Sequence, residues 1–166
     1  LKHSVCVFAD GLDVPNSGIW CAGSNKFGQL GNNNCGTSQA LWQGQPNLGS
    51  ETVTKTPTAT MNYQMNSVMV ITTAKNVWAW GDNTYGKLGR GGALQACNST
   101  PQKVSLPAGV GAVDIANGDE YSAFILGDNG KVYAMGRNNN GQLGDSTTPN
   151  RSTPVEVKLP RQAILS

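Results

Sequence analysis

The chain has 166 residues, which is enough for one ordinary domain with a buried core. Only 13% of the residues are charged and the formal net charge is +2, so a basic surface for nucleic acid is not indicated. No stretch approaches the roughly 18 consecutive apolar residues of a membrane helix, so membrane insertion is not expected. The 21 glycines and the abundant Asn and Thr predict a turn-rich β protein. Because the first residue is Leu1 rather than Met, we expect the chain to be a mature or excised part of a longer protein.

Apolar runs of strand length recur in pairs along the chain, and a turn separates the two members of each pair. The pairs are residues 3–9 with 18–23, 66–72 with 76–81, and 121–127 with 131–136. The last turn contains Asn129–Gly130, which favours a tight hairpin because both residues tolerate positive φ. In the second member of each pair, large residues alternate with small ones, so each predicted sheet has a large face and a small face. We expect the small face to let a neighbouring sheet approach closely.

A nine-residue pattern, G-x-N-x-x-G-[QK]-L-G, follows each pair of strands and is here called a Gly loop. Its copies are residues 23–31, 81–89 and 136–144, a period of roughly 55 residues that indicates an internal repeat. The shared turn residues are Gly23, Asn25, Gly28, Gly31, Gly81, Asn83, Gly86, Gly89, Gly136, Asn138, Gly141 and Gly144. We expect these glycines to adopt positive φ, the asparagines to bond the local backbone, and Leu30, Leu88 and Leu143 to fill the core between units. The alternative, a ligand-binding loop, concerns mainly Asn139 and Asn140, which the other copies lack.

After each Gly loop comes a polar loop and then Thr-Pro, at residues 56–57, 100–101 and 153–154. Strands are expected after the second and third Thr-Pro, and residues 112–117 are predicted as the fourth strand of the second unit. The units are residues 1–60, 61–118 and 119–166, the first with a loop insertion at 32–56. In that insertion Leu41 and Trp42 are a candidate recognition site, since aromatic residues dominate binding hot spots. Alternatively, Trp42 covers the core locally.

The first unit also departs from the others after its Thr-Pro, because the spacing from Pro57 to Ser67 leaves no room for a last strand. Either that strand has been deleted, or a segment of the natural chain is missing from the sequence at this point. A unit of about four short strands cannot bury both faces of its own sheet. Units stacked radially cover one another, which is the arrangement of a β-propeller.

These repeats resemble the regulator of chromosome condensation type, on the pattern of His-Ser, an apolar strand, the Gly loop and Thr-Pro. The resemblance covers nearly the whole chain and implies blades of a propeller that usually has seven. Three units alone leave apolar faces and strand edges open. Either the chain is a piece of a larger propeller, which we favour, or copies assemble to close it. The family includes a guanine-nucleotide exchange factor, a plant photoreceptor and a β-lactamase inhibitor, which share loops that contact protein partners.

Four cysteines allow two disulfides. Cys6 and Cys21 fall on the two strands of one predicted hairpin, so their Cα atoms can lie within disulfide range. The resemblance to bacterial extracellular members implies a bridge between them. Cys35 and Cys97 follow the Gly loops of consecutive units and could join them; the alternative is four thiols in a reducing compartment. With no C-x-x-C and only His3, a metal site is not expected.

No catalytic residues and no cofactor are predicted. His3 occupies a repeat position that Asn66 and Tyr121 hold in the other units, so it is a structural position. The leading hypothesis is a non-catalytic protein-interaction module, extracellular or at the cell surface, that presents loops on a rigid propeller. One alternative is a structural subunit of a surface appendage or fibre. The other is an intracellular regulator similar to the exchange factor.

Overall fold

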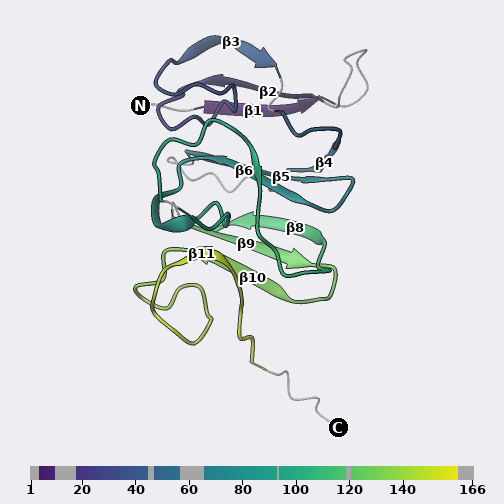
Figure 1. Ribbon diagram of the computed structural model, residues 1–166, viewed down its shortest axis with the longest axis vertical. Helices are drawn as coiled ribbons and strands as arrows, with labels where there is room; N and C mark the ends of the chain where they lie inside the picture. Colours follow the sequence, from purple (N-terminus) through teal and green to yellow (C-terminus); the bar gives the residue numbers. More distant parts are fainter. Residues whose placement is uncertain are drawn as a thin grey trace.

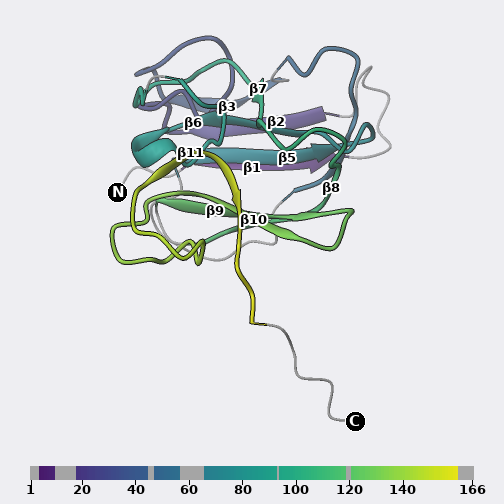
Figure 2. The same cartoon turned by 60° about the horizontal axis from the view of Figure 1, so that its bottom comes forward.

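Three antiparallel sheets, stacked face to face, make up the computed structural model (Figure 1 and Figure 2). It describes residues 4–9, 18–44, 47–56, 66–92, 94–118 and 121–160. Sheet 1 contains β1 (Ser4–Ala9), β2 (Gly18–Gly23) and β3 (Gln39–Gly44). Sheet 2 contains β4 (Val53–Lys55), β5 (Ser67–Thr72), β6 (Val77–Gly81) and β7 (Gln102–Lys103). Sheet 3 contains β8 (Ala112–Asn117), β9 (Ser122–Gly127), β10 (Val132–Gly136) and β11 (Arg151–Glu156). The predicted all-β, propeller-type fold is confirmed.

The sheets do not coincide with the sequence repeats, because each repeat passes one strand to the next sheet. Residues 112–117 form the predicted strand, but as β8 it pairs with β9 in sheet 3 rather than completing the second unit. In the same way β4, which precedes Pro57, pairs with β5 in sheet 2. This exchange ties sheets 2 and 3 to the unit that precedes each of them.

The predicted loop insertion at residues 32–56 is wrong. That segment contains two strands, β3 of sheet 1 and β4 of sheet 2, and from Gly31 the chain reaches β3 at Gln39. The Thr-Pro alignment was misleading because Thr100–Pro101 precedes β7, whereas Thr56 follows β4. No strand is therefore missing between the first two units, since β4 already occupies that place.

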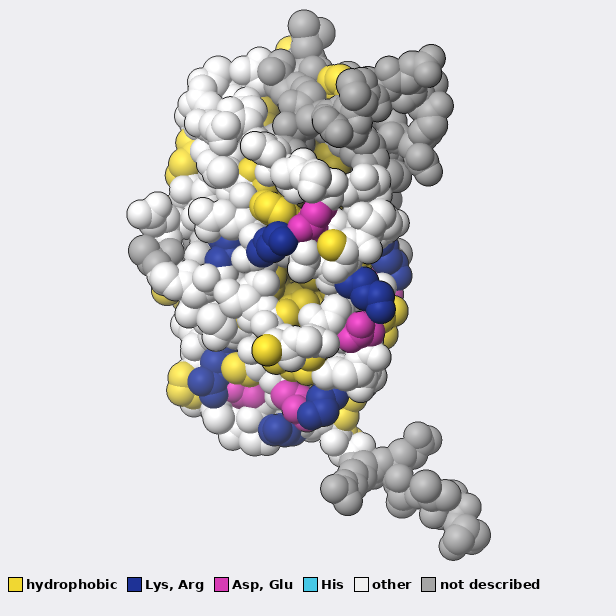
Figure 3. All heavy atoms as spheres, turned by 45° about the vertical axis from the view of Figure 1, so that its right-hand side comes forward, with side chains coloured by type: hydrophobic (Ala, Val, Ile, Leu, Met, Phe, Trp, Pro, Cys, Tyr) yellow, Lys and Arg dark blue, Asp and Glu magenta, His cyan; other side chains and the backbone are white. Residues whose placement is uncertain are grey.

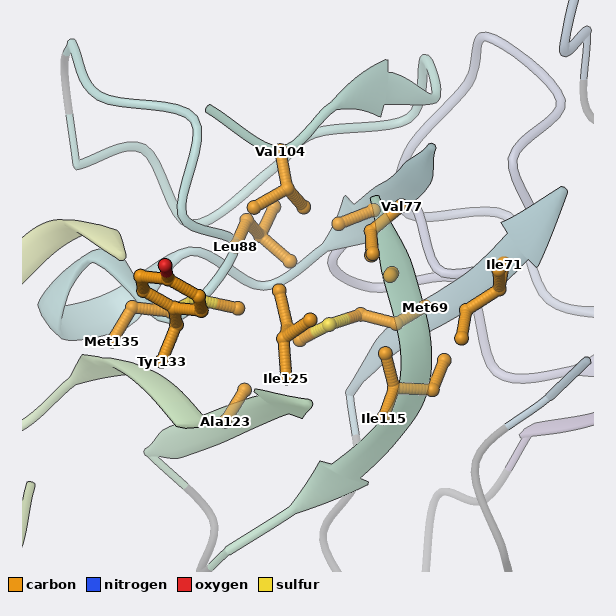
Figure 4. Packing of buried hydrophobic residues seen from close by; sticks show 12 residues of the cluster. Met69, Ile71, Val77, Leu88, Val104, Ile115, Ala123, Ile125, Tyr133 and Met135 are labelled. Atoms are coloured by element: carbon orange, nitrogen blue, oxygen red, sulfur yellow. The ribbon is translucent and has the colours of Figure 1, made fainter. Parts of the chain in front are cut away.

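Two apolar clusters fill the spaces between neighbouring sheets. Between sheets 1 and 2 lie Ile19, Cys21, Leu30, Leu48, Val53, Val70 and Trp80. Between sheets 2 and 3 lie Met69, Ile71, Val77, Ala79, Leu88, Val104, Ala112, Ile115, Ala123, Ile125, Tyr133 and Met135 (Figure 4). Leu30 and Leu88 therefore fill the core between units as predicted. Along β6, Trp78 and Trp80 face sheet 1 while Val77 and Ala79 face sheet 3, so each sheet turns its large face to the preceding sheet.

Both predicted disulfides are present. Cys6 and Cys21 are direct partners in the β1–β2 register, with Cα atoms 4.1 Å apart. Cys35 and Cys97 have Cα atoms 6.4 Å apart and join the loops that follow the first two Gly loops, across a sequence separation of 62. The second bridge therefore links sheets 1 and 2 at the Gly-loop end of the molecule, which lies on the left in Figure 1.

Charged side chains on the surface are mostly paired with the opposite sign. Lys55 of β4 lies 2.9 Å from Asp114 of β8, which joins sheets 2 and 3. Lys131 lies 2.8 Å from Glu156 within sheet 3. On the face shown in Figure 3, Lys and Arg side chains lie close to Asp and Glu rather than gathering into one basic area.

Glu51 anchors the segment before β4 to the hairpin of sheet 2. Its carboxylate accepts hydrogen bonds from Lys103 Nζ at 2.6 Å, Thr72 Oγ1 at 2.5 Å, Asn76 Nδ2 at 2.9 Å and Trp78 Nε1 at 3.0 Å. Burial alone raises the pKa of this carboxyl group, but these hydrogen bonds outweigh burial and lower its pKa from 4.5 to about 2. The strand exchange between units is thus secured by a carboxylate that must be ionised.

We predict that Glu51→Gln destabilises the fold and reduces its sensitivity to acid. Because the pKa of Glu51 is lowered by folding, its stabilisation is present above pH 4.5 and is lost as the pH falls towards 2. The variant should lose about 1–3 kcal/mol of unfolding free energy at neutral pH and show a shallower loss below pH 4.5. Urea denaturation across this pH range measures both. The matched control, Glu156→Gln on the exposed surface, should change stability at neutral pH little; equal effects of the two would contradict the assignment.

Candidate interaction site

The Gly loops are closed by one asparagine each. The Oδ1 atoms of Asn25, Asn83 and Asn138 accept hydrogen bonds of 3.0 Å from the backbone N–H of the leucine five residues later. These asparagines are 0%, 2% and 0% exposed. The glycines of all three loops adopt φ between 63° and 108°, which side chains rarely tolerate. The Gly loop is therefore a turn that is fixed by its glycines and its buried asparagine, as the sequence predicts.

The amide nitrogen of the same asparagine holds the polar loop that follows. Asn138 Nδ2 donates to the backbone oxygen of Thr147 at 2.9 Å and of Pro149 at 3.1 Å, and to Asp145 Oδ1 at 3.1 Å. In the first unit, Asn25 Nδ2 donates to the backbone oxygen of Asn34 at 2.8 Å. One side chain thus fixes both the turn and the loop that runs toward the outer strand.

Successive sheets meet where a glycine of one Gly loop lies against a serine of the next unit. A Cβ on Gly28 would lie 2.6 Å from Ser99 Cα, and a Cβ on Gly86 would lie 2.6 Å from Ser152 Cα. The backbone N–H of Asn33 donates to the oxygen of Ser99 at 3.1 Å. The N–H of Gly91 donates to the oxygen of Ser152 at 2.8 Å in the same way. Each junction therefore combines a Gly–Ser contact with a backbone hydrogen bond.

Tyr85, Tyr121, Arg137 and Asn139 gather at the Gly-loop end, between sheets 2 and 3, and are here called the Tyr–Arg cluster. The two tyrosine rings meet edge to face, with centroids 5.0 Å apart and planes at 80°. The Arg137 guanidinium carbon lies 5.3 Å from the Tyr85 centroid and 5.7 Å from the Tyr121 centroid. Arg137 Nε donates to Asn139 Oδ1 at 2.9 Å. The rings and the guanidinium are half-buried and Asn139 is exposed, so the cluster is held in place yet open to a partner.

The position of Tyr85 follows from the one substitution in the Gly-loop pattern. In the first and third loops, Gln29 and Gln142 accept hydrogen bonds of 2.9 Å from the N–H of the residue two positions earlier. The second loop has Lys87 there, which cannot accept, and Tyr85 alone of the three takes a left-handed φ, 61°. A tyrosine in this conformation is strained and is held by its contacts.

Lys87 supports the cluster from beneath. Its Nζ lies 2.9 Å from Asp82 Oδ2, and the two side chains are 3% and 5% exposed. The same ammonium lies 5.7 Å from the ring centroid of Tyr121. Asp82 Oδ1 in turn accepts from the N–H and hydroxyl of Thr84, at 3.0 Å and 2.6 Å, in the short 3-10 turn η1 (Thr84–Gly86). A buried ion pair therefore replaces the glutamine and fixes the base of the cluster.

The residues predicted as a binding site are only partly brought together. Asn139 belongs to the Tyr–Arg cluster, and Asn140 is exposed beside it, with its N–H bonded to Gln142. Leu41 and Trp42 lie in β3 rather than in a loop, and their side chains fall outside the described residues, so their role stays a prediction. Tyr85, Tyr121 and Arg137 were not predicted from the sequence. The substitution of Lys for Gln in the second loop was the available signal.

The described residues were compared with two kinds of site, a metal site and a membrane span. Within it, no three His, Cys, Asp or Glu side chains lie close enough together to hold a metal ion. Among the same residues, no helix is long and apolar enough to cross a membrane.

We predict that Asn138→Ala unfolds the third Gly loop, whereas the neighbouring Asn139→Ala does not. The first change leaves the Leu143 N–H and the Thr147 oxygen without their partner, which should cost about 2–4 kcal/mol. The second removes an exposed contact and should change stability by less than about 0.5 kcal/mol. Chemical denaturation of both variants measures the difference, and similar values would refute the role of the buried amide.

We also predict that Gly28→Ala weakens the junction between sheets 1 and 2. Gly36→Ala is the matched control, because Gly28 and Gly36 have φ of 80° and 91° but nothing lies within 4 Å of a Cβ on Gly36. Both variants carry the left-handed strain, whereas only Gly28→Ala also pushes on Ser99. Gly28→Ala should be less stable than the control by about 1–3 kcal/mol in urea denaturation. Indistinguishable midpoints would show that the junction tolerates a methyl group.

Comparison with known proteins identifies the repeat. The model of the regulator of chromosome condensation (RCC1) repeat matches residues 76–125 and 129–165, and a second model of the same repeat matches 112–142. The chain is 30% identical over 136 residues to the human probable E3 ubiquitin-protein ligase HERC4, covering 82% of this chain and 12% of that protein. It is 38% identical over 84 residues to human HERC3, covering 51% of this chain and 8% of that protein.

Solved structures show the same fold at low sequence identity. Human WBSCR16 superposes with a TM-score of 0.69 at 15% identity, covering 84% of this chain and 33% of that one. Prp20p of Saccharomyces cerevisiae superposes with a TM-score of 0.64 at 17% identity, covering 89% and 34%. The chain thus spans about a third of these structures and a much smaller share of the ubiquitin ligases. It belongs to the regulator of chromosome condensation (RCC1) repeat family.

Proposed function

We propose that the chain is a non-catalytic protein-interaction module whose main contact is the Tyr–Arg cluster. The observation that carries this proposal is a half-buried pair of tyrosines under an arginine, at the loop end of a rigid β scaffold. Tyr and Arg are enriched at the energetic centres of protein interfaces. The strained Tyr85 and the ion pair beneath it hold these side chains in position before a partner arrives, which lowers the entropic cost of binding.

Structural neighbours support a protein partner. Yeast Prp20 is known in a structure with Kap60 bound, and Prp20p is described with its binding to Gsp1p and histones. These partners belong to the yeast protein, and the present chain covers 33–34% of it. The ligase activity named for the HERC relatives belongs to proteins of which this chain matches 12% or less.

An extracellular or cell-surface location forms part of the proposal. Its support is the pair of disulfides, because such bridges persist in oxidising compartments. Alkylation of the native protein before and after reduction tests it: no reactive thiols are expected before reduction. Four alkylated thiols in protein taken from its source would overturn this location. They would favour the alternative of an intracellular regulator similar to a guanine-nucleotide exchange factor, which acceleration of nucleotide release from a GTPase would test.

We predict that Arg137→Glu strongly weakens partner binding and that Lys131→Glu does not. The two residues flank β10 at its opposite ends, so the control makes the same charge reversal in the same sheet, away from the cluster. The biotinylated, oxidised chain and both variants are incubated with the extracellular proteins of the source organism, and captured proteins are quantified by mass spectrometry. The candidate partner's affinity is then measured by surface plasmon resonance. Arg137→Glu should weaken it by at least roughly 30-fold, the loss typical of a hot spot.

Two outcomes would contradict the proposal. Full binding by Arg137→Glu would remove the Tyr–Arg cluster from the interface. The second outcome concerns the capture experiment. If every protein captured by the wild type and by Lys131→Glu is also captured by Arg137→Glu, or if none is captured, the result argues against an interaction module. Thermal unfolding of both variants confirms that lost binding is not lost folding.

A further inference from the structure

The charges of the described residues are compensated everywhere except at the Gly-loop end. Each carboxylate among these residues forms an ion pair with a lysine or an arginine, namely Glu51, Asp82, Asp114, Asp128, Asp145 and Glu156. Within the same part of the chain, the cations that no carboxylate pairs are Lys26, Arg90 and Arg137. Lys26 and Arg137 lie in the first and third Gly loops, and Arg90 directly follows the second. The uncompensated positive charge is therefore gathered at one end of the described molecule, one cation from each unit.

Contacts between neighbouring loops hold Lys26 and Arg90 near each other. The Arg90 guanidinium donates hydrogen bonds to Asn98 Oδ1 and, at 3.3 Å, to the backbone oxygen of Thr100. The N–H of Asn98 donates to the Phe27 oxygen at 3.1 Å, and Lys26 Nζ lies 5.0 Å from the Phe27 ring centroid. Lys26 is exposed and Arg90 is half-buried. The two cations therefore lie on either side of one contact between the first two units.

Arg137 has donors that the fold does not use. Its Nε donates to Asn139, whereas its two terminal nitrogens form no hydrogen bond with any residue that the structure describes. A guanidinium presents its N–H groups in a planar fork that matches the two oxygens of a carboxylate. The half-buried position against Tyr85 and Tyr121 fixes this fork and leaves it less hydrated than a fully exposed arginine. Arg137 is thus suited to bidentate recognition of an anionic group.

The distribution of the three cations favours carboxylates over phosphate as that anionic group. A phosphate group carries up to two charges at one point and is typically bound by several donors that converge on it. In the described structure each unit instead supplies a single unpaired cation, and the formal net charge of the whole chain is only +2. An extended segment with several acidic side chains can present one carboxylate to each cation.

We propose that the Gly-loop end binds an acidic segment of the partner protein, and that one Asp or Glu carboxylate of this segment accepts two hydrogen bonds from the terminal nitrogens of Arg137. Lys26 and Arg90 attract further carboxylates of the same segment. This inference rests on the interaction function proposed above and names the chemistry of the partner at that same site. Complementary charge of this kind also accelerates association and fixes the orientation of the partner.

The experiment follows the oxidised, isotope-labelled chain by NMR during titration with a synthetic peptide of alternating glutamate and glycine. A peptide in which glutamine replaces every glutamate is the uncharged control. We expect the glutamate peptide to shift the amide signals of Lys26, Arg90 and Asn139, and the Nε–H signal of Arg137. The hairpin turns at residues 73–76 and 128–130 should keep their signals, because their charges are already paired. Sodium chloride at about 0.5 M should weaken binding at least about 10-fold.

Two substitutions that remove the same charge test the role of Arg137. Arg137→Gln should raise the dissociation constant of the glutamate peptide about 5- to 10-fold, the loss typical of a charge-assisted hydrogen bond. Lys131→Gln is the matched control, because Lys131 lies at the other end of β10 and is paired with Glu156; it should change the constant less than about twofold. The wild-type chain retains Asp119 and Glu120, which fall outside the described residues, so peptide binding also shows that they do not occupy the fork.

The results separate this inference from the interaction function itself. Absence of shifts at the Gly-loop end, equal binding of the glutamine peptide, or equal effects of the two substitutions would overturn the acidic partner. Tighter binding of inorganic phosphate than of the peptide would overturn the choice of carboxylate. In each of these cases, a protein whose capture depends on Arg137 would still support the interaction function. Conversely, specific binding of the glutamate peptide without any captured protein would support the chemistry and count against that function.

Discussion

A sheet of four short strands has two apolar faces and cannot cover both itself. The stacking of the three sheets follows from that constraint. The large face, with Trp78 and Trp80, needs a small face opposite it, and the preceding sheet provides one with Ile19 and Cys21. Close approach of the backbones at the Gly-loop end then requires glycine on one side and serine on the other. The outer strand that crosses to the next sheet and the Cys35–Cys97 bridge add covalent continuity to the same contact.

Some residues of each Gly loop are needed for stacking and others are not, so the sequence at the loop end can vary between copies while the stacking of the sheets stays the same. The glycines, the asparagine and the leucine of each Gly loop are engaged in the fold, so they carry no freedom for recognition. The exposed positions between them differ in all three copies. In the second copy, Lys87 replaces the glutamine whose side-chain oxygen accepts from a backbone N–H in the other loops. Tyr85 in this copy has a left-handed conformation, and its ring meets Tyr121 of the next unit. A single change in the repeat thus builds a site from two units.

The sequence was sufficient for what is local and repeated. Hairpins, Gly loops, the role of Asn138 and the pairing of Cys6 with Cys21 all depend on residues close in sequence or aligned by the period. It was insufficient where pairing is non-local and the strand is short. β4 has only three residues and does not show the alternation that identifies a strand, so it was not predicted, whereas β7 was expected after the second Thr-Pro. The Tyr–Arg cluster escaped for a related reason: Tyr85 and Tyr121 meet only through the stacking of sheets 2 and 3.

The Tyr–Arg cluster and the stacked faces of the sheets depend on different physical interactions. Sheets 2 and 3 meet through buried apolar side chains, so their contact depends mainly on shape and on the removal of water. The Tyr–Arg cluster has its cation over aromatic rings at the loop end, where binding of an anionic partner weakens as salt rises. Arg137 lies in the third Gly loop but reaches toward sheet 2, where its guanidinium lies over the ring of Tyr85. Stacking of the sheets therefore leaves the cluster accessible at the loop end, with its rings and guanidinium half-buried and Asn139 exposed.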